Sequence, residues 1–455
     1  MKKYIITNDT EITEKNVNTW ITDFTSNIQP HLLYLDEFYQ GTDDIKKYPF
    51  DQKRIDNDIH INLAYMTVQN VVSYCFGKAP TQDYHKNFKN GSYIEELKYK
   101  NKDKTENKAI ENSCSKYGLG YEYIGVREVN GVKEPFYKRL DPLTSFVVKD
   151  DSILEETVCF VTYTMVKPKN GSAYMQGYVY VVGEIIPFDC KTGAVKFGTR
   201  ERNVAFKDKL PVVLYKNNDD MCGDYEKATE ILSAYSKLYS VSMDDHESIA
   251  NALLLFYNTD LPDEEKEKLN RSRVAALMGD NVKAEYIYKK LDSASFNALK
   301  EGLRSEFYAI TNLADFTDVT AYNKSASAIL YKLVGMENIR VDKSAYFEEG
   351  MRERWDIISS YVARPFEIKY NDMTYTFYNN LPASVENDLA IMGLVEKGGL
   401  SLETALKKLE NVEDAEGEYK RILAEKRQAV LDVIEDIKTS NNVNLNGELD
   451  KSEIA

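Results

Sequence analysis

The four histidines, a residue type that often serves in acid–base catalysis and metal binding, are scattered through this sequence. His31, His60, His85 and His246 show neither HxxxH nor HExxH spacing, so the sequence does not support a histidine metal site. No Ser-His-Asp or Cys-His grouping stands out as a nucleophile with its base, and no GxxxxGK[ST] stretch is present to hold a nucleotide phosphate. We therefore predict no catalytic, metal-binding or cofactor-binding residues and no enzyme activity.

One short run is superficially similar to a catalytic motif. Pro262, Asp263, Glu264, Glu265 and Lys266 resemble the PD-(D/E)xK motif of a class of nucleases. In those enzymes the first acid and the ExK part lie on separate strands, whereas here all five residues fit into one helical turn. We interpret the run as the start of an acidic helix, in which proline occupies the first turn and the carboxylates favour the positive end of the helix dipole.

Length, charge and cysteine content limit the classes of function. The chain has 455 residues and 43% hydrophobic residues, enough for a sizeable core divided over several domains. Its formal net charge of −15 argues against tight wrapping of nucleic acid, which needs Lys and Arg to displace phosphate counterions, but it does not exclude DNA that slides past. Five cysteines without a CxxC pair favour a reduced environment. No signal-like start and no long apolar run are present, so we predict a protein that is neither secreted nor membrane-spanning.

The chain up to about Tyr117 has helical periodicity, with two apolar stripes that should face a core. The stripes consist of Trp20, Ile21, Phe24 and Ile28, and of Ile61, Ala64, Val68, Val71, Val72 and Cys75. Over residues 119–214 the period becomes two, which is typical of strands, and Asn130-Gly131 predicts a hairpin turn. Further strands are expected at 157–166, 173–182, 184–188 and 211–214. This region is therefore predicted to be an antiparallel β domain.

Two long amphipathic patterns follow, and a single compact core would not need them. The first spans 224 to about 257, begins with Asp224 as a candidate N-cap, and would extend roughly 50 Å at 1.5 Å per residue. The second spans 293–313 and begins at Ser293 or Ser295. Because each has an apolar face, we expect the two helices to pair as antiparallel arms. Between them, an acidic helix at 261–269 and strands at 274–278 and 284–288 predict a small αβ tip.

Residues 314–324 lack periodicity and predict a loop. A long helix is expected from Ser325 to about Val362, with candidate bends at Gly335 and Gly350. Beyond it, residues 366–370 and 374–378 alternate around Asn371-Asp372, which predicts a second hairpin.

The C-terminal part is predicted to be helical, with helices at 384–396, 401–409 and 418–438. The polar stretch 441–455 is expected to be disordered. Together with the β domain, these helices predict an α+β fold.

An ordered set of sequence blocks resembles a known family. The segment KSASAILYKLVGMEN, at 324–338, resembles the S-G-x-A-x-x-Y-K-L-x-G-x-E block of bacteriophage portal proteins, in the family typified by the portal of the Bacillus phage SPP1. Upstream, NNDDMCGDYEKATEILSAYSKLYS resembles the acid-rich entry into that family's first long helix. Downstream, EEGMRERWDII resembles the K-G-L-R-R-R-x-K-L-I block, and GGLSLETALKKL resembles the G-x-I-S-x-x-T-x-L block. The resemblance covers about residues 55–427.

The resemblance implies a mainly helical portal fold with an antiparallel β wing region, long stem helices, a small αβ clip and a helical crown. The implied regions are a wing at 1–223, stem helix 1 at 224–258, a clip at 259–292, stem helix 2 at 293–313, a tunnel loop at 314–324, a long wing helix and β-hairpin at 325–378, a crown at 379–440 and a disordered tail at 441–455. It further implies a dodecameric ring at one capsid vertex, assembled in the host cytoplasm and retained in the virion, through which double-stranded DNA is packaged and ejected. The implied partners are further copies of the chain, the large terminase subunit, the major capsid and scaffolding proteins and a head-completion or adaptor protein, and no membrane.

Three groups of site residues follow from this resemblance. The tunnel loop that lines the DNA channel contains Asp315, Phe316, Thr317, Asp318, Val319, Thr320, Tyr322, Asn323 and Lys324. The stem interface between subunits contains Ile231, Leu232, Tyr235, Leu238, Leu299, Leu303 and Phe307. The clip surface that docks the motor and the adaptor contains Asp263, Glu264, Glu265, Arg271 and Arg273. Lys324, and also Lys300, Arg304 or Lys237 if they face inward, would give sparse positive contacts with DNA; the alternative is that they are solvated charges on helix faces.

Two classes of function therefore remain open. One is a ring-forming conduit for DNA, for which net acidity is suitable because a strongly basic lumen would hold phosphates. The other is a non-ring DNA-processing or scaffold-type protein of phage head morphogenesis. Images of the purified protein separate them, since only the first shows a ring with a central hole.

Overall fold

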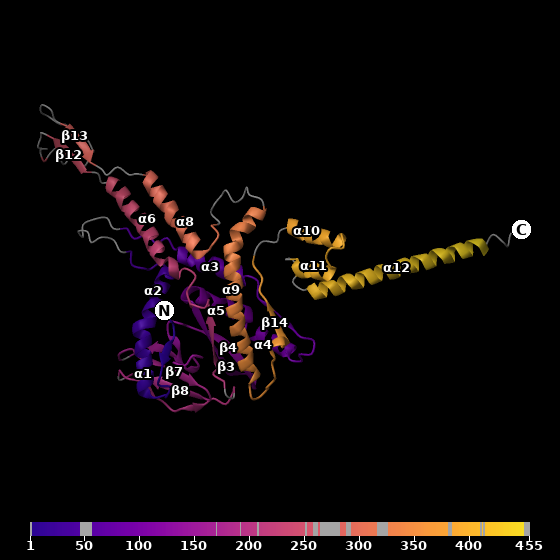
Figure 1. The fold of residues 1–455 in the computed structure, drawn as a ribbon, viewed down its shortest axis with the longest axis horizontal. Coiled ribbons are helices and arrows are strands. Elements are labelled where there is room, and N and C mark those ends of the chain that lie inside the picture. Colours follow the sequence, from indigo (N-terminus) through magenta and orange to yellow (C-terminus); the bar gives the residue numbers. More distant parts are fainter. Residues whose placement is uncertain are drawn as a thin grey trace. The chain divides into compact units, whose positions relative to one another are not determined.

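The computed structural model describes residues 2–45, 57–169, 171–191, 193–206, 209–250, 253–257, 263, 283–287, 293–315, 326–380, 385–409, 412 and 415–449. The chain divides into two compact units, Met1–Asn380 and Leu381–Ala455. Helices and strands are mixed, as expected for an α+β fold (Figure 1). Within the described residues, we find no helix with the length and apolar content needed to cross a lipid bilayer.

Helices dominate the start of the first unit. They are α1 (Glu14–Asp23), the π-helical turn η1 (Phe24–Ile28), α2 (Gln29–Gln40), α3 (Leu63–Phe76), α4 (Gly91–Lys100) and α5 (Asp103–Tyr117). Local chemistry sets their ends: Thr13 Oγ1 accepts the Asn16 N–H at 3.2 Å, and Gly41 ends α2 with φ of 69°. Both predicted apolar stripes are buried, apart from Ile61, which precedes α3 and is half-buried. These helical predictions are therefore confirmed.

Two sheets follow where the sequence predicts one β domain. The larger has the order β1-β5-β6-β7-β8-β10, with β9 paired to β8, and the smaller has the order β11-β3-β4. The strands are β1 (Ile5–Thr7), β3 (Leu119–Val129), β4 (Val132–Leu140), β5 (Ser145–Asp150), β6 (Thr157–Val166), β7 (Tyr174–Val181), β8 (Glu184–Asp189), β9 (Lys196–Phe197), β10 (Glu201–Arg202) and β11 (Val212–Lys216). Within these two sheets the neighbours are antiparallel, except that β1 runs parallel to β5.

The predicted hairpin is β3–β4, and its turn is formed by Asn130 (φ 52°) and Gly131 (φ 80°). Two positive φ angles in a row match the right-handed twist of the flanking strands. The sheets share a core in which the Tyr121 and Phe160 rings meet edge to face, with centroids 5.1 Å apart. Both rings are buried, so side chains from β3 and β6 hold the two sheets together.

The two arms are α6 (Thr229–Ala250) and α8 (Ser293–Thr311), which run side by side in Figure 1. The Tyr239 and Phe296 rings meet at 5.7 Å, which confirms the predicted pairing of the arms. The first helix is shorter than predicted, because residues Leu253–Tyr257 form strand β12, antiparallel to β13 (Lys283–Ile287). The run LLLFY suits a strand as well as a helix, and its partner is remote in sequence. Of the two tip strands predicted, 284–288 corresponds to β13 and 274–278 lies outside the described residues.

The long helix α9 (Ala326–Ser359) passes through both predicted bends without a break. Its two glycines instead allow close approach of other segments: a Cβ at Gly335 would lie 2.5 Å from the Asn312 carbonyl oxygen, and one at Gly350 would lie 2.4 Å from the Tyr215 ring. The lack of a side chain at these two positions therefore serves close packing, and the bends stay a prediction.

The predicted second hairpin does not form. Residues Tyr370–Asp372 make a 3-10 turn, and β14 (Met373–Thr376) pairs antiparallel with β2 (Thr81–Tyr84). The alternation at 366–370 reflects half-burial of Phe366, whose ring packs edge to face on Tyr93 at 5.9 Å. Arg352 donates to the carbonyl oxygens of Tyr370 and Met373 at 3.0 and 3.2 Å, and so shapes the turn.

The second unit contains α10 (Val385–Glu396), α11 (Leu402–Lys408) and α12 (Ala415–Leu449). Ser401 caps α11 by accepting the Thr404 N–H at 3.2 Å. Disorder was predicted from residue 441, but α12 continues to Leu449. No proline interrupts this stretch, and extending an existing helix costs less than nucleating one. Residues 450–455 lie outside the described residues.

Candidate assembly and DNA-channel surfaces

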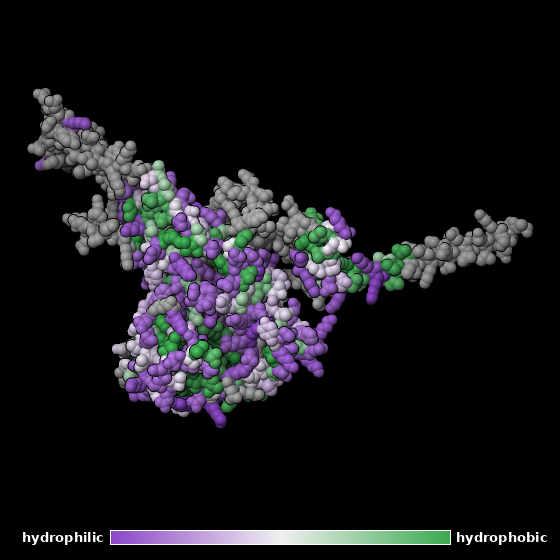
Figure 2. Space-filling view, viewed as in Figure 1, coloured by the Kyte–Doolittle hydropathy of each residue, from purple (hydrophilic) through white to green (hydrophobic). Residues whose placement is uncertain are grey.

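The arms carry apolar side chains both on their shared face and on their outer face. Leu232, Tyr235 and Phe307, three of the predicted interface residues, are buried within their own chain. Ile231, Leu238 and Leu303 are half-buried, and Leu299 is 55% exposed. Figure 2 shows hydrophobic residues on the surface of α8. The predicted stripe therefore serves first to pair the arms, and Leu299 is its outward member.

Three further apolar residues on the arms are exposed, namely Val241 (40%), Met243 (42%) and Ile310 (46%). Ile310 belongs to the apolar pattern that predicts the second arm. Val241 and Met243 lie off the main stripe of α6, so periodicity alone does not single them out. With Leu299 they are the exposed apolar side chains of the two arms, and we call them together the outer arm surface, although Val241 and Met243 lie on different sides of α6.

An extended segment at 57–61 is bonded along α6. Ser236, Ser240 and Asp244, one helical turn apart, accept the backbone N–H groups of Ile61, Ile59 and Asn57 at 3.2, 2.9 and 2.8 Å. Side chains at i, i+4 and i+8 share one helix face, and alternate N–H groups of an extended chain share one edge. We call this segment the strap. Hydrophobic periodicity does not reveal the strap, because its acceptors on α6 are two serines and an aspartate.

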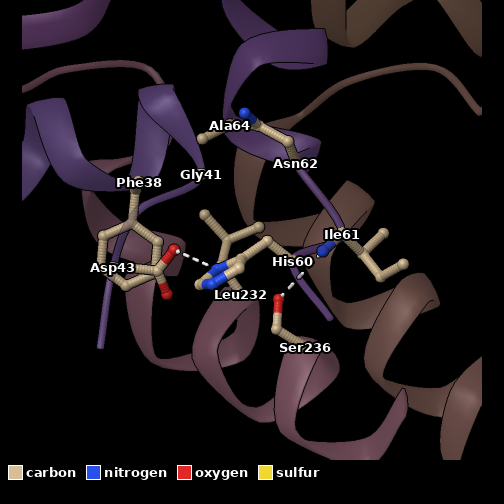
Figure 3. Close-up of a pocket in the computed structure, with 9 residues that line it drawn as sticks. All are labelled: Phe38, Gly41, Asp43, His60, Ile61, Asn62, Ala64, Leu232 and Ser236. Carbon is tan, nitrogen blue, oxygen red and sulfur yellow. Dashed lines mark hydrogen bonds and ion pairs between the residues drawn. The ribbon is translucent and has the colours of Figure 1, made fainter. Parts of the chain in front are cut away.

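A small pocket lies beneath the strap, between the end of α2, the start of α3 and α6 (Figure 3). His60 Nδ1 contacts Asp43 Oδ1 at 3.1 Å, and Asp43 is only 7% exposed. In the described part of the chain, no three His, Cys, Asp or Glu side chains are grouped to hold a metal ion. The contact between His60 and Asp43 therefore connects the strap to the segment that follows α2.

The root of α6 is fixed by a charged cluster around Glu226. The Lys3 ammonium donates to Glu226 Oε2 at 2.6 Å, His31 Nε2 contacts Oε1 at 2.7 Å, and the Gly223 N–H donates to Oε2 at 2.7 Å. Burial alone would raise the pKa of Glu226, but the bonds from His31, Lys3 and Gly223 outweigh it and hold the pKa at about 2. The ionised carboxylate thus ties the N-terminal segment to the start of the first arm.

A second cluster connects α9 with the segment before α6. Lys343 is 3% exposed, and its ammonium contacts Glu111 Oε1 at 2.7 Å and Asp224 Oδ2 at 3.1 Å. Burial, with a smaller contribution from the negative charge of Asp224, raises the pKa of Glu111 to about 7 despite the nearby Lys343 ammonium. Asp224 was predicted to cap the first arm. Its carboxylate instead accepts from Ser115 Oγ at 2.5 Å and from Asn217 Nδ2 at 2.9 Å, and α6 begins later, at Thr229.

A third cluster surrounds Arg354, which is completely buried. Its guanidinium donates to Glu122 Oε2 at 2.7 Å, to Asp103 Oδ1 at 2.8 Å and to Asn107 Oδ1 at 2.7 Å. It also lies over the Tyr137 ring, 4.4 Å from the centroid. Arg354, one of the two arginines in the block EEGMRERWDII, is therefore internal and unavailable to DNA.

Of the tunnel-loop residues, only Asp315 lies within the described residues. The Arg304 guanidinium contacts Asp315 Oδ1 at 2.8 Å and lies over the Tyr308 ring at 5.8 Å. Lys300 contacts Glu301 at 3.2 Å, and Lys237 is half-buried. Phe316, Thr317, Asp318, Val319, Thr320, Tyr322, Asn323 and Lys324 lie outside the described residues.

The clip residues are described only in part. Asp263 is helical and exposed, while Glu264, Glu265, Arg271 and Arg273 lie outside the described residues. The β12–β13 ladder, from Leu253↔Ile287 to Tyr257↔Lys283, joins the two arms at their far ends.

The described residues thus form two paired arms with exposed apolar side chains, on a base fixed by buried ion pairs. A family model described as "Phage portal protein, SPP1 Gp6-like" matches residues 20–431. The chain therefore belongs to the SPP1-like phage portal protein family, as its sequence blocks predict. Proteins of this family are structural, capsid-associated components of the virion, not enzymes. No curated protein matches the chain.

Proposed function

We propose that this chain forms a dodecameric ring at one capsid vertex, through which double-stranded DNA is packaged and later ejected. Membership of the portal family carries the proposal. The outer arm surface supports it, because four partly exposed apolar side chains on two long helices favour contact with neighbouring copies. The net charge of −15 also suits a passage that does not hold phosphates.

In this proposal, α6 and α8 form the stem, residues 314–324 form the tunnel loop, and α10, α11 and α12 belong to the crown. The clip begins at β12, earlier than residue 259, because β12 pairs with β13. The large terminase subunit and the head-completion or adaptor protein dock on the clip, and the capsid and scaffolding proteins contact the wing at 1–223. The ring assembles in the host cytoplasm before DNA enters.

The test combines native mass measurement with one pair of variants. Leu299→Asp places a charge on the outer arm surface, where contact with a neighbour would bury it without a partner. Asn297→Asp adds the same charge at an exposed position on the same helix and is the matched control. We expect rings from the parent and from the control, and smaller species with unchanged helix content from Leu299→Asp. Normal rings from Leu299→Asp would remove α8 from the interface, and a parent protein without rings would favour the non-ring scaffold or DNA-processing alternative.

A further inference from the structure

One end of the large sheet carries exposed apolar side chains on neighbouring connections. The β5–β6 loop presents Ile153 (103% exposed) and Leu154 (79%). The β7–β8 turn presents Val182 (52%), and Val204 (58%) follows β10. We call these four residues the sheet-end surface. Apolar side chains gathered in this way on a protein surface mark sites of interaction.

The strand order brings the four residues to the same end of the sheet. Because neighbouring strands are antiparallel, β5 and β7 end where β6 and β8 begin. The Asn203 N–H donates to the Gly183 carbonyl oxygen at 2.8 Å, which places Val204 beside the β7–β8 turn. In Figure 1, β7 and β8 lie away from the arms α6 and α8. The sheet-end surface is therefore separate from the outer arm surface.

The β5–β6 loop is held in one conformation by its own polar residues. Asp150 Oδ1 accepts the Ser152 hydroxyl and the Glu156 N–H, each at 2.8 Å. Glu155 has a φ of 49°, which residues other than glycine rarely adopt, and its carboxylate accepts the Tyr4 hydroxyl at 2.5 Å. A backbone of this kind persists only where the surrounding contacts hold it. The loop thus presents its apolar side chains without having to become ordered on binding, which favours affinity.

The charges around this surface limit what can cover it. The exposed charged groups beside the four residues are three carboxylates and one guanidinium, on Asp151, Glu156, Glu201 and Arg202. This excess of negative charge repels the phosphates of nucleic acids and of anionic lipids. A second copy of this chain, with its net charge of −15, is also a poor electrostatic match. The complementary partner is a different protein, with an apolar pocket and Lys or Arg residues at the rim of that pocket.

We propose that the sheet-end surface docks into an apolar pocket with a basic rim on the major capsid protein. The family to which this chain belongs is capsid-associated, so a protein of the shell is available to it as a partner. The inference rests on the proposed place of the protein at a capsid vertex, but it does not depend on the number of copies there. It narrows the proposed capsid contact from the whole wing to four side chains.

Photo-crosslinking during head assembly tests this contact. The full-length chain, with a photoreactive amino acid at position 153, replaces the parent chain in cells infected by a phage that lacks this gene. On irradiation, we expect an adduct with the major capsid protein from position 153. We expect at least tenfold less from position 132, which is exposed at the tip of the β3–β4 hairpin. An adduct from position 153 with a scaffolding protein or with a second copy of this chain would overturn the choice of partner.

Two pairs of substitutions test the chemistry of the contact. Ile153→Ser with Leu154→Ser removes apolar surface and keeps the polar bonds of the loop, so the amount of this chain per capsid protein in purified heads should fall severalfold. Asp151→Lys with Glu156→Lys should lower the same ratio, because the new charges oppose a basic rim. The matched control, Val129→Ser with Val132→Ser, should keep the parent ratio. An unchanged ratio in the serine pair at 153 and 154 would overturn the docking, and an unchanged ratio in the lysine pair would overturn the basic rim.

Native mass measurement separates this inference from the proposed ring. Rings of normal mass from the 153 and 154 serine pair, with reduced incorporation into heads, support both. Rings with unchanged incorporation overturn the docking and leave the ring intact. Loss of rings in this variant would place the surface between copies and also overturn the docking. Adducts with the capsid protein from position 153, in a parent chain that forms no rings, would support the docking and overturn the ring.

Discussion

Two charged residues of α9, Lys343 and Arg354, are buried, although Lys and Arg side chains are almost never buried unless they are paired. Taking such charges out of water costs several kcal/mol each, and close partners with good geometry must offset that cost. Arg354 meets this requirement with three donated bonds at 2.7–2.8 Å. Lys343 meets it with two carboxylates. We infer that these residues position α9 against α5 and the small sheet.

Arg354→Met should destabilise the first unit strongly. It leaves Glu122, which is itself fully buried, without its cationic partner, and breaking a buried pair in this way typically costs about 3–5 kcal/mol. Denaturant unfolding measures the loss. Lys227→Met, which removes an exposed pair with Asp220, is the control and should change little. Equal stability of the two variants would show that the Arg354 cluster does not support the fold.

Glu226 predicts a dependence of stability on acid pH. Because its folded pKa of about 2 is below the ordinary value of 4.5, the ionised carboxylate stabilises the fold above about pH 4.5. This contribution, about 3 kcal/mol at most from the shift, is lost as the pH falls from 4.5 towards 2. Glu226→Gln should therefore have a lower melting temperature than the parent at pH 7. This difference in melting temperature should become smaller as the pH falls from 4.5 towards 2. Glu230→Gln, at an exposed site one turn later, should keep the parent's pH profile.

Among the elements, the strap depends on side chains that periodicity does not reveal. Replacing Ser236 and Ser240 together with Ala removes the acceptors for the Ile61 and Ile59 N–H groups. Hydrogen exchange at these two amides should then accelerate, while amides in the β3–β4 hairpin keep their rates. Ser242→Ala on the same helix is the matched control. Unchanged exchange in the double variant would mean that the strap is held by other contacts.

The elements also show what could be predicted from the sequence. The β3–β4 hairpin was predictable because Asn130 and Gly131 specify the turn locally. The pairing of β14 with β2 was not, since Met373 lies 289 positions after its partner Tyr84 (373 − 84 = 289) and no local signal connects them. The inward direction of Leu232 and Tyr235 was equally hidden, because an apolar stripe shows that a face is buried but not which chain buries it.

At the scale of the whole molecule, the ring proposed above depends on the outer arm surface, while the charged clusters restrict which residues can meet DNA. Arg354 and Lys343 are internal, and Arg304 is partly neutralised by Asp315. Of the basic residues considered for the channel, Lys300 is also paired, with Glu301, so two of the three that the structure describes have a carboxylate partner. Such a ring would let DNA pass without strong retention.

Replacing residues 316–323 with a Gly/Ser linker of equal length tests the role assigned to the tunnel loop. The replacement keeps Asp315, the partner of Arg304, and the number of residues between α8 and α9. Native mass measurement should therefore show that the variant assembles into the same rings as the parent. If the loop contacts DNA in the channel, phage production from this variant should fall and heads should package or retain less DNA. Asp315→Asn in an otherwise intact loop is the control that separates loss of the Arg304 pair from loss of the loop. Normal DNA content in heads built with the linker variant would refute a role for this loop in translocation, and loss of rings would instead show that the loop serves assembly.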